Sequence, residues 1–329
     1  MPRPPRRVAR ARSSWALATA IPIRGAAASP ALEATTRGRA LKTALEQPAT
    51  EDQVLTADTS TLEYLRASGL SERYIDSFFR PFYGGITLNR ELTTSARVLR
   101  FTLRMLATGR TVVPALGMGE IPRQLASRLP EGAIRRNSPV EELLREGERV
   151  VGVRSAGEEH EADAVVVATD APAAGALTGE VVPEGSVGEV CMYYETDGLG
   201  SGKKILLNAE DGAFVNNAVE MSNISEKYAP PDRHLLYAVA LTGLDLPDDE
   251  LYRRGIEDLS RWYPDADFRP LSLRRIPYGQ FAQPPGIDAF WALRSTTCAE
   301  APDPDDVLLR RIAGRQTCKT CGYIYNIYY

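Results

Sequence analysis

Two cysteines near the end of the sequence have the spacing of a metal-binding turn. Cys318 and Cys321 form a C-x-x-C pair, and such a turn can direct two thiolates at one metal ion. A tetrahedral thiolate site needs four ligands, and the other two cysteines, Cys191 and Cys298, lack any comparable context. We therefore expect an incomplete metal site at Cys318 and Cys321, which two copies of the chain would complete only by pooling their thiolates.

Two glycine-rich stretches look like nucleotide-binding loops, but both depart from the required patterns. Segment 117–122 (GMGEIP) has a proline where a dinucleotide fingerprint has its last glycine, and no clear βαβ unit surrounds it. Segment 198–204 (GLGSGKK) lacks the first glycine and the final Ser or Thr of a phosphate-binding loop. The two histidines, His160 and His234, belong to no recognisable nucleophile–base arrangement. We expect ordinary turns at both glycine-rich stretches.

Helices are expected in the chain before the glycine-rich stretch at 117–122. Ser60, Ser71 and one of residues 93–95 are expected to cap three of them. Pro81 and the pair at 84–85 (GG) are expected to end the second helix. The apolar residues of the third helix lie on most of its sides, which favours burial.

A valine-rich run marks the expected centre of a parallel sheet. Ala164–Ala168 is continuously apolar between polar turns, a pattern typical of strands buried on both faces. Before it, Gly147 separates two apolar stretches, 140–144 and 150–153, which predict a hairpin. After it, Asp170 is expected to cap a short helix.

Strand patterns dominate the region after residue 187. Apolar and alternating stretches at 189–194, 203–207, 235–241 and 271–276 predict four strands. Helical spacing of apolar residues predicts one helix at 248–262. The region is expected to form a sheet with a helix against it.

The order of these elements resembles the flavin amine oxidase and phytoene desaturase superfamily of FAD-binding proteins. The resemblance rests on the hairpin and valine-rich run, on FFRPFYGGITLNRELTTSARVLRF at 78–101, and on RRIPYGQFAQPPG at 274–286. It implies an α/β (α+β) fold in which a partial FAD/NAD(P)-binding domain carries a helical insertion beside a mixed-sheet substrate domain. The implied parts are a disordered or targeting-like leader at 1–48, the helical insertion at 49–115, the partial FAD-binding domain at 116–180, the substrate-binding sheet domain at 181–286, and an irregular tail at 287–329.

The resemblance implies an FAD-dependent oxidoreductase that acts on a small apolar or amine-like substrate. It gives Val140 a backbone contact with the adenine, and it places Ala168 and Thr169 in a turn beside the ADP part of FAD. The family's opening glycine fingerprint and closing Gly-Asp segment have no counterpart in this sequence. We therefore expect a truncated chain that binds FAD weakly or not at all.

Two alternatives remain open at this point. One is a non-catalytic fragment that has the domain architecture without the cofactor. The other is an electron-transfer fusion, because CKTCGYIY at 318–325 resembles the first metal knuckle of a rubredoxin.

Composition restricts the partners and the location. The chain is 43% hydrophobic and 25% charged, and its net charge of −4 gives no reason to expect a nucleic-acid partner. No apolar run reaches the roughly 18 residues of a membrane-spanning helix, which leaves peripheral membrane contact open. Few, scattered cysteines favour a cytoplasmic location, whereas an arginine-rich stretch without acidic residues before Glu33 is typical of organelle targeting. The oligomeric state is left open.

Overall fold

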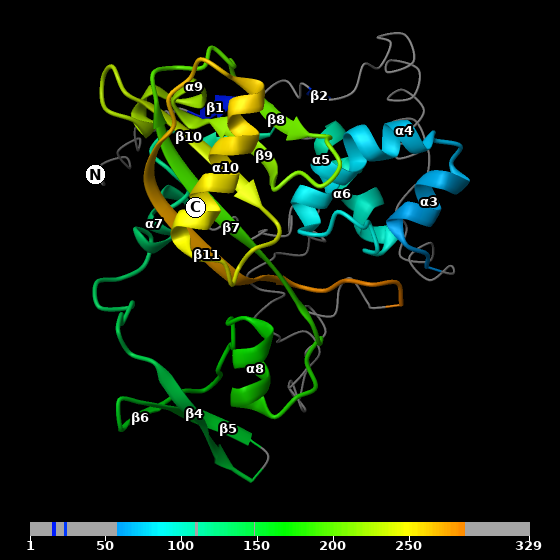
Figure 1. Ribbon diagram of the computed structural model, residues 1–329. Helices are drawn as coiled ribbons and strands as arrows, with labels where there is room; N and C mark the ends of the chain where they lie inside the picture. Colours follow the sequence, from blue (N-terminus) through cyan, green and yellow to red (C-terminus); the bar gives the residue numbers. More distant parts are fainter. Residues whose placement is uncertain (1–14, 18–22, 25–57, 109–110, 148, 287–329) are drawn as a thin grey trace, which may run out of the picture.

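A computed structural model describes residues 15–17, 23–24, 58–108, 111–147 and 149–286. It has three parts: a helical segment, a small sheet with one helix beside it, and a larger sheet with a helix across it (Figure 1). The α/β (α+β) class is therefore confirmed. Of the expected leader only two short strands are described, and the expected tail with Cys318 and Cys321 lies outside the described residues.

The larger sheet has six strands in the order β11-β7-β10-β9-β8-β2. Its neighbouring strands are antiparallel, except that β2 runs parallel to β8. All four predicted strands belong to it, whereas β9, whose middle carries two asparagines, is not indicated by the sequence pattern. The bounds are β2 Ile23–Arg24, β7 Ser186–Thr196, β8 Ile205–Asn208, β9 Val215–Glu220, β10 His234–Ala240 and β11 Arg269–Phe281.

Helix α10, Asp248–Trp262, covers one face of this sheet and has the predicted bounds. Three acidic residues lie in its first turn, where the helix dipole favours negative charge. Leu251 and Leu259 of α10 are fully buried. They belong to one core with the even-numbered side chains of β7, namely Val190, Met192 and Tyr194.

The helical segment begins with the capping that the sequence predicts. Ser60 Oγ accepts a hydrogen bond from the backbone N–H of Glu63, whose carboxylate accepts one from the N–H of Ser60. This reciprocal pair satisfies two free N–H groups at the helix start. Ser71 Oγ caps the next helix with a single hydrogen bond, which it accepts from the N–H of Tyr74. The helices are α3 Thr61–Ala67, α4 Glu72–Tyr74, α5 Arg80–Thr87 and α6 Ala96–Thr108, with a π-helical stretch Ile75–Phe79 between α4 and α5.

The second helix does not end where the sequence indicates. Pro81 lies in the first turn of α5, where its missing N–H is not needed. Gly84 lies inside α5. The following loop passes so close that only a residue without a side chain fits there, since a Cβ at Gly84 would be 2.9 Å from the Cα of Arg90. The helix ends instead at Leu88, which adopts the left-handed conformation with φ of 54°.

The predicted hairpin is present and forms part of a three-stranded sheet. Strands β4 (Val140–Glu146) and β5 (Arg149–Ser155) pair across the turn at Gly147, and β6 (Glu158–Glu161) pairs with β5. The prediction that Ala164–Ala168 forms a central buried strand is wrong, because these residues form no strand and the side chain of Val166 is 68% exposed. A strand buried on both faces needs neighbouring strands to pair its backbone, and none of the described strands lies beside this run.

Helix α8 (Ala171–Thr178) lies beside the small sheet, whereas α7 (Glu120–Ala126), which precedes the sheet in the chain, lies apart from it (Figure 1). As predicted, Pro122 lies in α7, and Asp170 caps α8 by accepting a hydrogen bond of 3.0 Å from the N–H of Ala173. Large apolar side chains stay exposed between residues 116 and 181, on α7 and around the small sheet: Leu116, Leu125, Leu129, Ile134, Val140, Val166 and Val181. Since domains are built from packed layers, the described residues form only one side of a covered core here.

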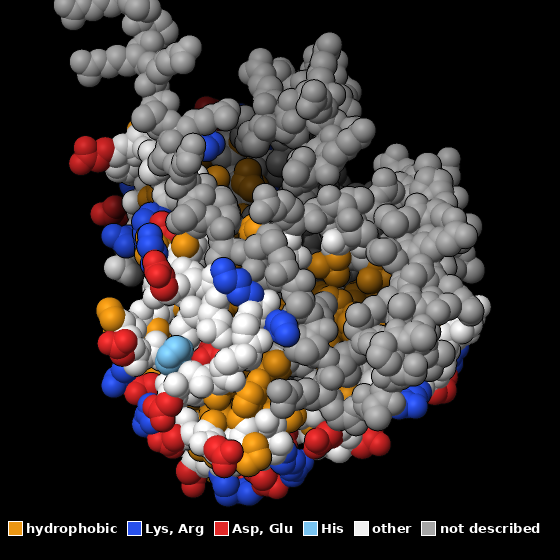
Figure 2. Space-filling model, turned by 90° about the horizontal axis from the view of Figure 1, so that it is seen from above, with side chains coloured by type: hydrophobic (Ala, Val, Ile, Leu, Met, Phe, Trp, Pro, Cys, Tyr) orange, Lys and Arg blue, Asp and Glu red, His pale blue; other side chains and the backbone are white. Residues whose placement is uncertain are grey.

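Figure 2 shows charges of both signs interspersed along the edge of one face of the molecule, with apolar side chains between them. Within the described residues, no helix is long and apolar enough to cross a bilayer.

Gly255→Ala tests how closely α10 approaches the sheet. A Cβ at this position would overlap the Oη of Tyr194 and lie 3.0 Å from the Sδ of Met192. We expect the substitution to lower the free energy of unfolding by about 1–3 kcal/mol, as measured by urea denaturation. Adding Tyr194→Phe removes the obstructing hydroxyl and should restore most of this loss. Equal destabilisation in the single and double variants would contradict the packing.

Candidate functional site

The residues that the resemblance links to the ADP part of FAD lie in the small-sheet part. Val140 begins β4 and is 40% exposed, and Ala168 and Thr169 are exposed residues between β6 and α8. Helix α8 packs against β4, so the three positions lie in the same part of the molecule (Figure 1). Their role in binding FAD stays a prediction.

The described residues of this part do not form a pyrophosphate site. The N-terminus of α8 is capped by the carboxylate of Asp170, whose negative charge opposes a phosphate at that position. Helix α7 opens with Glu120, which pairs with Arg123. In the described residues, the two helix starts of this region therefore offer carboxylates rather than free N–H groups to a phosphate.

A second candidate site lies on the larger sheet, on the face opposite α10. Side chains alternate along a strand, so the odd-numbered residues of β7 point away from the core beneath α10. We call this surface the polar face of β7 and define it as Glu189, Cys191 and Tyr193 of β7 with Tyr237 of β10. The register of the two strands places Tyr193 directly opposite Tyr237.

The polar face is held together by contacts between its own side chains. Cys191 Sγ and Tyr237 Oη lie 3.2 Å apart in a hydrogen bond. The rings of Tyr193 and Tyr237 have centroids 5.2 Å apart and are tilted by 43°. Arg274 of β11 stands opposite Cys191 in the strand register. The face therefore combines a thiol, two phenols and a carboxyl within one stretch of sheet.

Burial shifts the acid–base properties of the polar face. It raises the pKa of the Cys191 thiol to about 12, with a further contribution from the nearby Glu189 carboxylate. Burial likewise raises the pKa of Tyr193 to about 12. The pKa of Glu189 is also raised by burial, an effect that a hydrogen bond with Cys191 reduces. Clusters of perturbed groups are typical of functional sites, although buried structural networks also produce them.

Apolar residues and a short strand border the polar face. Strand β3, Val112–Pro114, pairs with β1, Trp15–Leu17. Beyond β9, helix α9 (Met221–Ile224) and a short helical turn (Glu226–Tyr228) hold β3 in place. Tyr228 Oη donates a hydrogen bond to Pro114 O at 2.8 Å, and Ser225 Oγ donates one to Ala115 O at 3.1 Å. Val113 thereby packs on the buried cluster around Cys191 and Tyr237.

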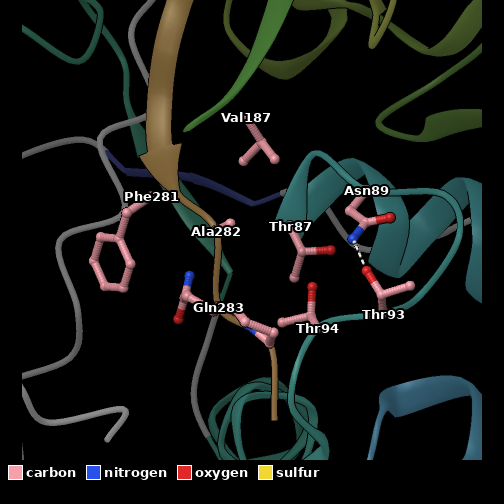
Figure 3. A pocket seen from close by; sticks show the side chains of 9 residues that line it. Thr87, Asn89, Thr93, Thr94, Val187, Phe281, Ala282 and Gln283 are labelled. Atoms are coloured by element: carbon pink, nitrogen blue, oxygen red, sulfur yellow. Dashed lines mark hydrogen bonds between the residues drawn. The ribbon is translucent and has the colours of Figure 1, made fainter. Parts of the chain in front are cut away.

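A small pocket lies where the helical segment meets the ends of β7 and β11 (Figure 3). Its volume is about 100 Å³. Thr87, Asn89, Thr93 and Thr94 come from the helical segment (Figure 3). Val187 comes from β7, and Ala282 and Gln283 follow the end of β11. Asn89 Nδ2 donates a hydrogen bond of 2.6 Å to Thr93 Oγ1 at its edge. The lining residues are Thr87, Asn89, Thr93, Thr94, Val187, Phe281, Ala282, Gln283 and Pro284.

Buried hydrogen bonds fix the helical segment to the sheet. Arg90 Nη1 donates to Asn216 Oδ1 at 3.0 Å and to Asn208 O at 3.2 Å. Asn216 Nδ2 in turn donates to Pro81 O at 3.0 Å. Nearer the pocket, the N–H of Ser95 donates to Gln283 O at 2.8 Å. The pocket therefore lies between two parts that are joined by specific contacts.

No local sequence pattern singles out the polar face. Residues 189–194 match a strand, and period-two alternation along it puts Glu189, Cys191 and Tyr193 on one side. The contribution of Tyr237 depends on the pairing of β7 with β10, which no local signal indicates. Among the described residues no cluster suited to a metal ion is present, and the expectation for Cys318 and Cys321 lies outside them.

The sequence matches the family model of flavin containing amine oxidoreductases over residues 4–318. The chain therefore belongs to this family, which is one of flavin-dependent oxidoreductases. The resemblance to this superfamily is confirmed at that level. No curated protein matches the sequence.

Solved structures of other proteins share the fold. An oxidoreductase from Methanosarcina mazei is 17% identical with a TM-score of 0.63, and the alignment covers 78% of this chain and 64% of that one. A putrescine oxidase bound to putrescine is 14% identical with a TM-score of 0.55, covering 79% and 66%. Reduced UDP-galactopyranose mutase is 13% identical with a TM-score of 0.53, covering 76% and 62%. The chain thus spans less than two thirds of each of these proteins.

Alkylation of Cys191 tests the burial of the polar face. The thiolate is the reactive form of cysteine, and a pKa of about 12 leaves roughly one thiol in 10⁴ ionised at pH 8. We expect native Cys191 to react with iodoacetamide at least about 100-fold more slowly than Cys191 in the urea-unfolded chain. Peptide mass spectrometry follows this one site. Equal rates in the native and unfolded states would contradict the assignment.

Proposed function

We propose that this chain works in a flavin-dependent oxidoreductase that oxidises a small apolar or amine-like substrate. In this proposal the chain supplies the substrate-binding sheet, the helical segment and the adenine-side edge of the FAD site. The observation that carries this proposal is that the two faces of the larger sheet differ in chemistry. Helix α10 covers one face, and the other face bears a partly buried carboxyl, a thiol and two tyrosines.

The proposal gives this chain's residues binding and orienting roles. In flavoenzymes the flavin carries the two electrons, and the protein positions the substrate. Cys191 and Tyr193 are neutral near pH 7, as ordinary thiols and phenols are, and burial, which raises both pKa values to about 12, keeps them neutral at higher pH as well. Cys191 and Tyr237 are almost fully buried, so on this face a substrate would reach the partly buried Glu189 and Tyr193.

We further propose that the described residues form only part of the FAD site. The exposed Val166 and the self-capped start of α8 support this proposal. The same two observations favour the second candidate, a non-catalytic fragment that binds no cofactor.

Titration with FAD, followed by flavin fluorescence, separates these candidates. We expect saturable binding weaker than about 10 μM, competed by ADP, because the described residues offer an adenine-side edge without a pyrophosphate site. Submicromolar stoichiometric binding would contradict the partial site. No binding at any usable FAD concentration would contradict the oxidoreductase role of this chain. The non-catalytic fragment would then be the remaining candidate.

A further inference from the structure

We propose that the pocket between the helical segment and the ends of β7 and β11 binds a small neutral carboxamide, and that Thr94 is the residue that selects it. The inference goes beyond the proposed function, because it concerns a different site and involves no flavin.

The first support is a buried hydroxyl group that has no partner. Thr94 is only 4% exposed, and its carbonyl accepts a hydrogen bond of 2.7 Å from the N–H of Thr61. The next N–H, that of Ser95, donates to Gln283 O at 2.8 Å, so the backbone is fixed at this point. Among the described residues, however, Thr94 Oγ1 has no hydrogen-bond partner. It lies in the wall of the pocket and is directed toward Thr87 (Figure 3). Because buried polar groups are nearly always hydrogen-bonded, this hydroxyl group calls for a partner in the pocket.

The second support is the way in which the neighbouring hydroxyl groups are already used. Thr87 Oγ1 donates its hydrogen to Tyr83 O at 3.0 Å, so its oxygen is left to accept. Thr93 Oγ1 accepts from Asn89 Nδ2 at 2.6 Å, so its hydrogen is left to donate. The hydroxyl group of Thr94 can do either. A carboxamide carries an accepting carbonyl and a donating N–H on separate atoms, which matches this set of groups.

The third support is the charge and the size of the pocket. None of the described residues that line it is charged, so an ion would lose its hydration there without gaining a counter-ion. Val187 and Ala282 offer apolar surface to a short alkyl group. Since one water occupies about 30 Å³ of the liquid, a volume of about 100 Å³ suits a molecule of roughly three to five non-hydrogen atoms.

Saturation-transfer difference NMR of the full chain with propanamide tests the proposal. Propanoate and propylammonium serve as ligands of similar shape that carry a charge. We expect propanamide to bind with a Kd on the order of 1 mM, and both ions to bind at least about tenfold more weakly.

Three variants locate the binding. Thr94→Val removes the hydroxyl group at nearly constant size, and losing one hydrogen bond should weaken propanamide binding about three- to tenfold. Thr94→Ser keeps the hydroxyl group and should stay close to the wild type in affinity. Thr178→Val is the matched control, because Thr178 lies on α8 outside the pocket and donates to Ala174 O at 2.7 Å. Its affinity for propanamide should equal that of the wild type.

Several results would overturn the proposal: no propanamide binding by the wild type, equally tight binding of either ion, unchanged affinity in Thr94→Val, or an equal loss in Thr178→Val. Thermal melting followed by circular dichroism checks that the variants fold. Ala282→Leu fills the pocket from the side of the sheet and should abolish propanamide binding, so it decides the question if Thr94→Val does not fold. Retained binding in Ala282→Leu would also overturn the proposal.

Discussion

The register of β7 is the constraint on which the rest of the structure depends. The strand is held between β10 and β11, and its alternating side chains serve two different surfaces. Met192 and Tyr194 enter the core beneath α10, while Cys191 and Tyr193 face the other way. A slip of one residue would exchange these sets, placing apolar side chains on the polar face and a carboxyl in the core. Close contact of Tyr194 with Gly255 of α10 opposes such a slip.

A second constraint joins the helical segment to this sheet. Burial lowers the pKa of Arg90, which shows that its charge has lost part of its hydration. Asn216 and the carbonyl of Asn208 replace that hydration. Removing either partner would leave a buried cation incompletely bonded, which is costly. This joint holds the helical segment against β8 and β9. The small-sheet part has no comparable network and keeps its apolar side chains exposed.

The features predicted from sequence are those with local causes. Ser60, Ser71 and Asp170 cap helices through side chains three residues or fewer from their partners, and the bounds of α10 follow from its apolar spacing. Ala164–Ala168 could not be placed by the same means, because an apolar run becomes a buried strand only when other strands pair with it. The polar face also escaped prediction, since it joins β7 to Tyr237, which lies more than forty positions later. Val140, Ala168 and Thr169 act through the backbone in the expected role, so their side chains carry little information.

The central claim is that the larger sheet is a stable scaffold, whereas the small-sheet part, as its described residues form it, lacks a covered core. Amide hydrogen exchange of the purified chain, resolved by peptide mass spectrometry, tests this claim directly. The backbone amides of β7 and β10 pair with neighbouring strands, so they should be among the slowest to exchange. The amides of Ala164–Ala168 form no backbone hydrogen bond in the described structure and should exchange within the shortest labelling time. Protection of Ala164–Ala168 equal to that of β7 would contradict the account.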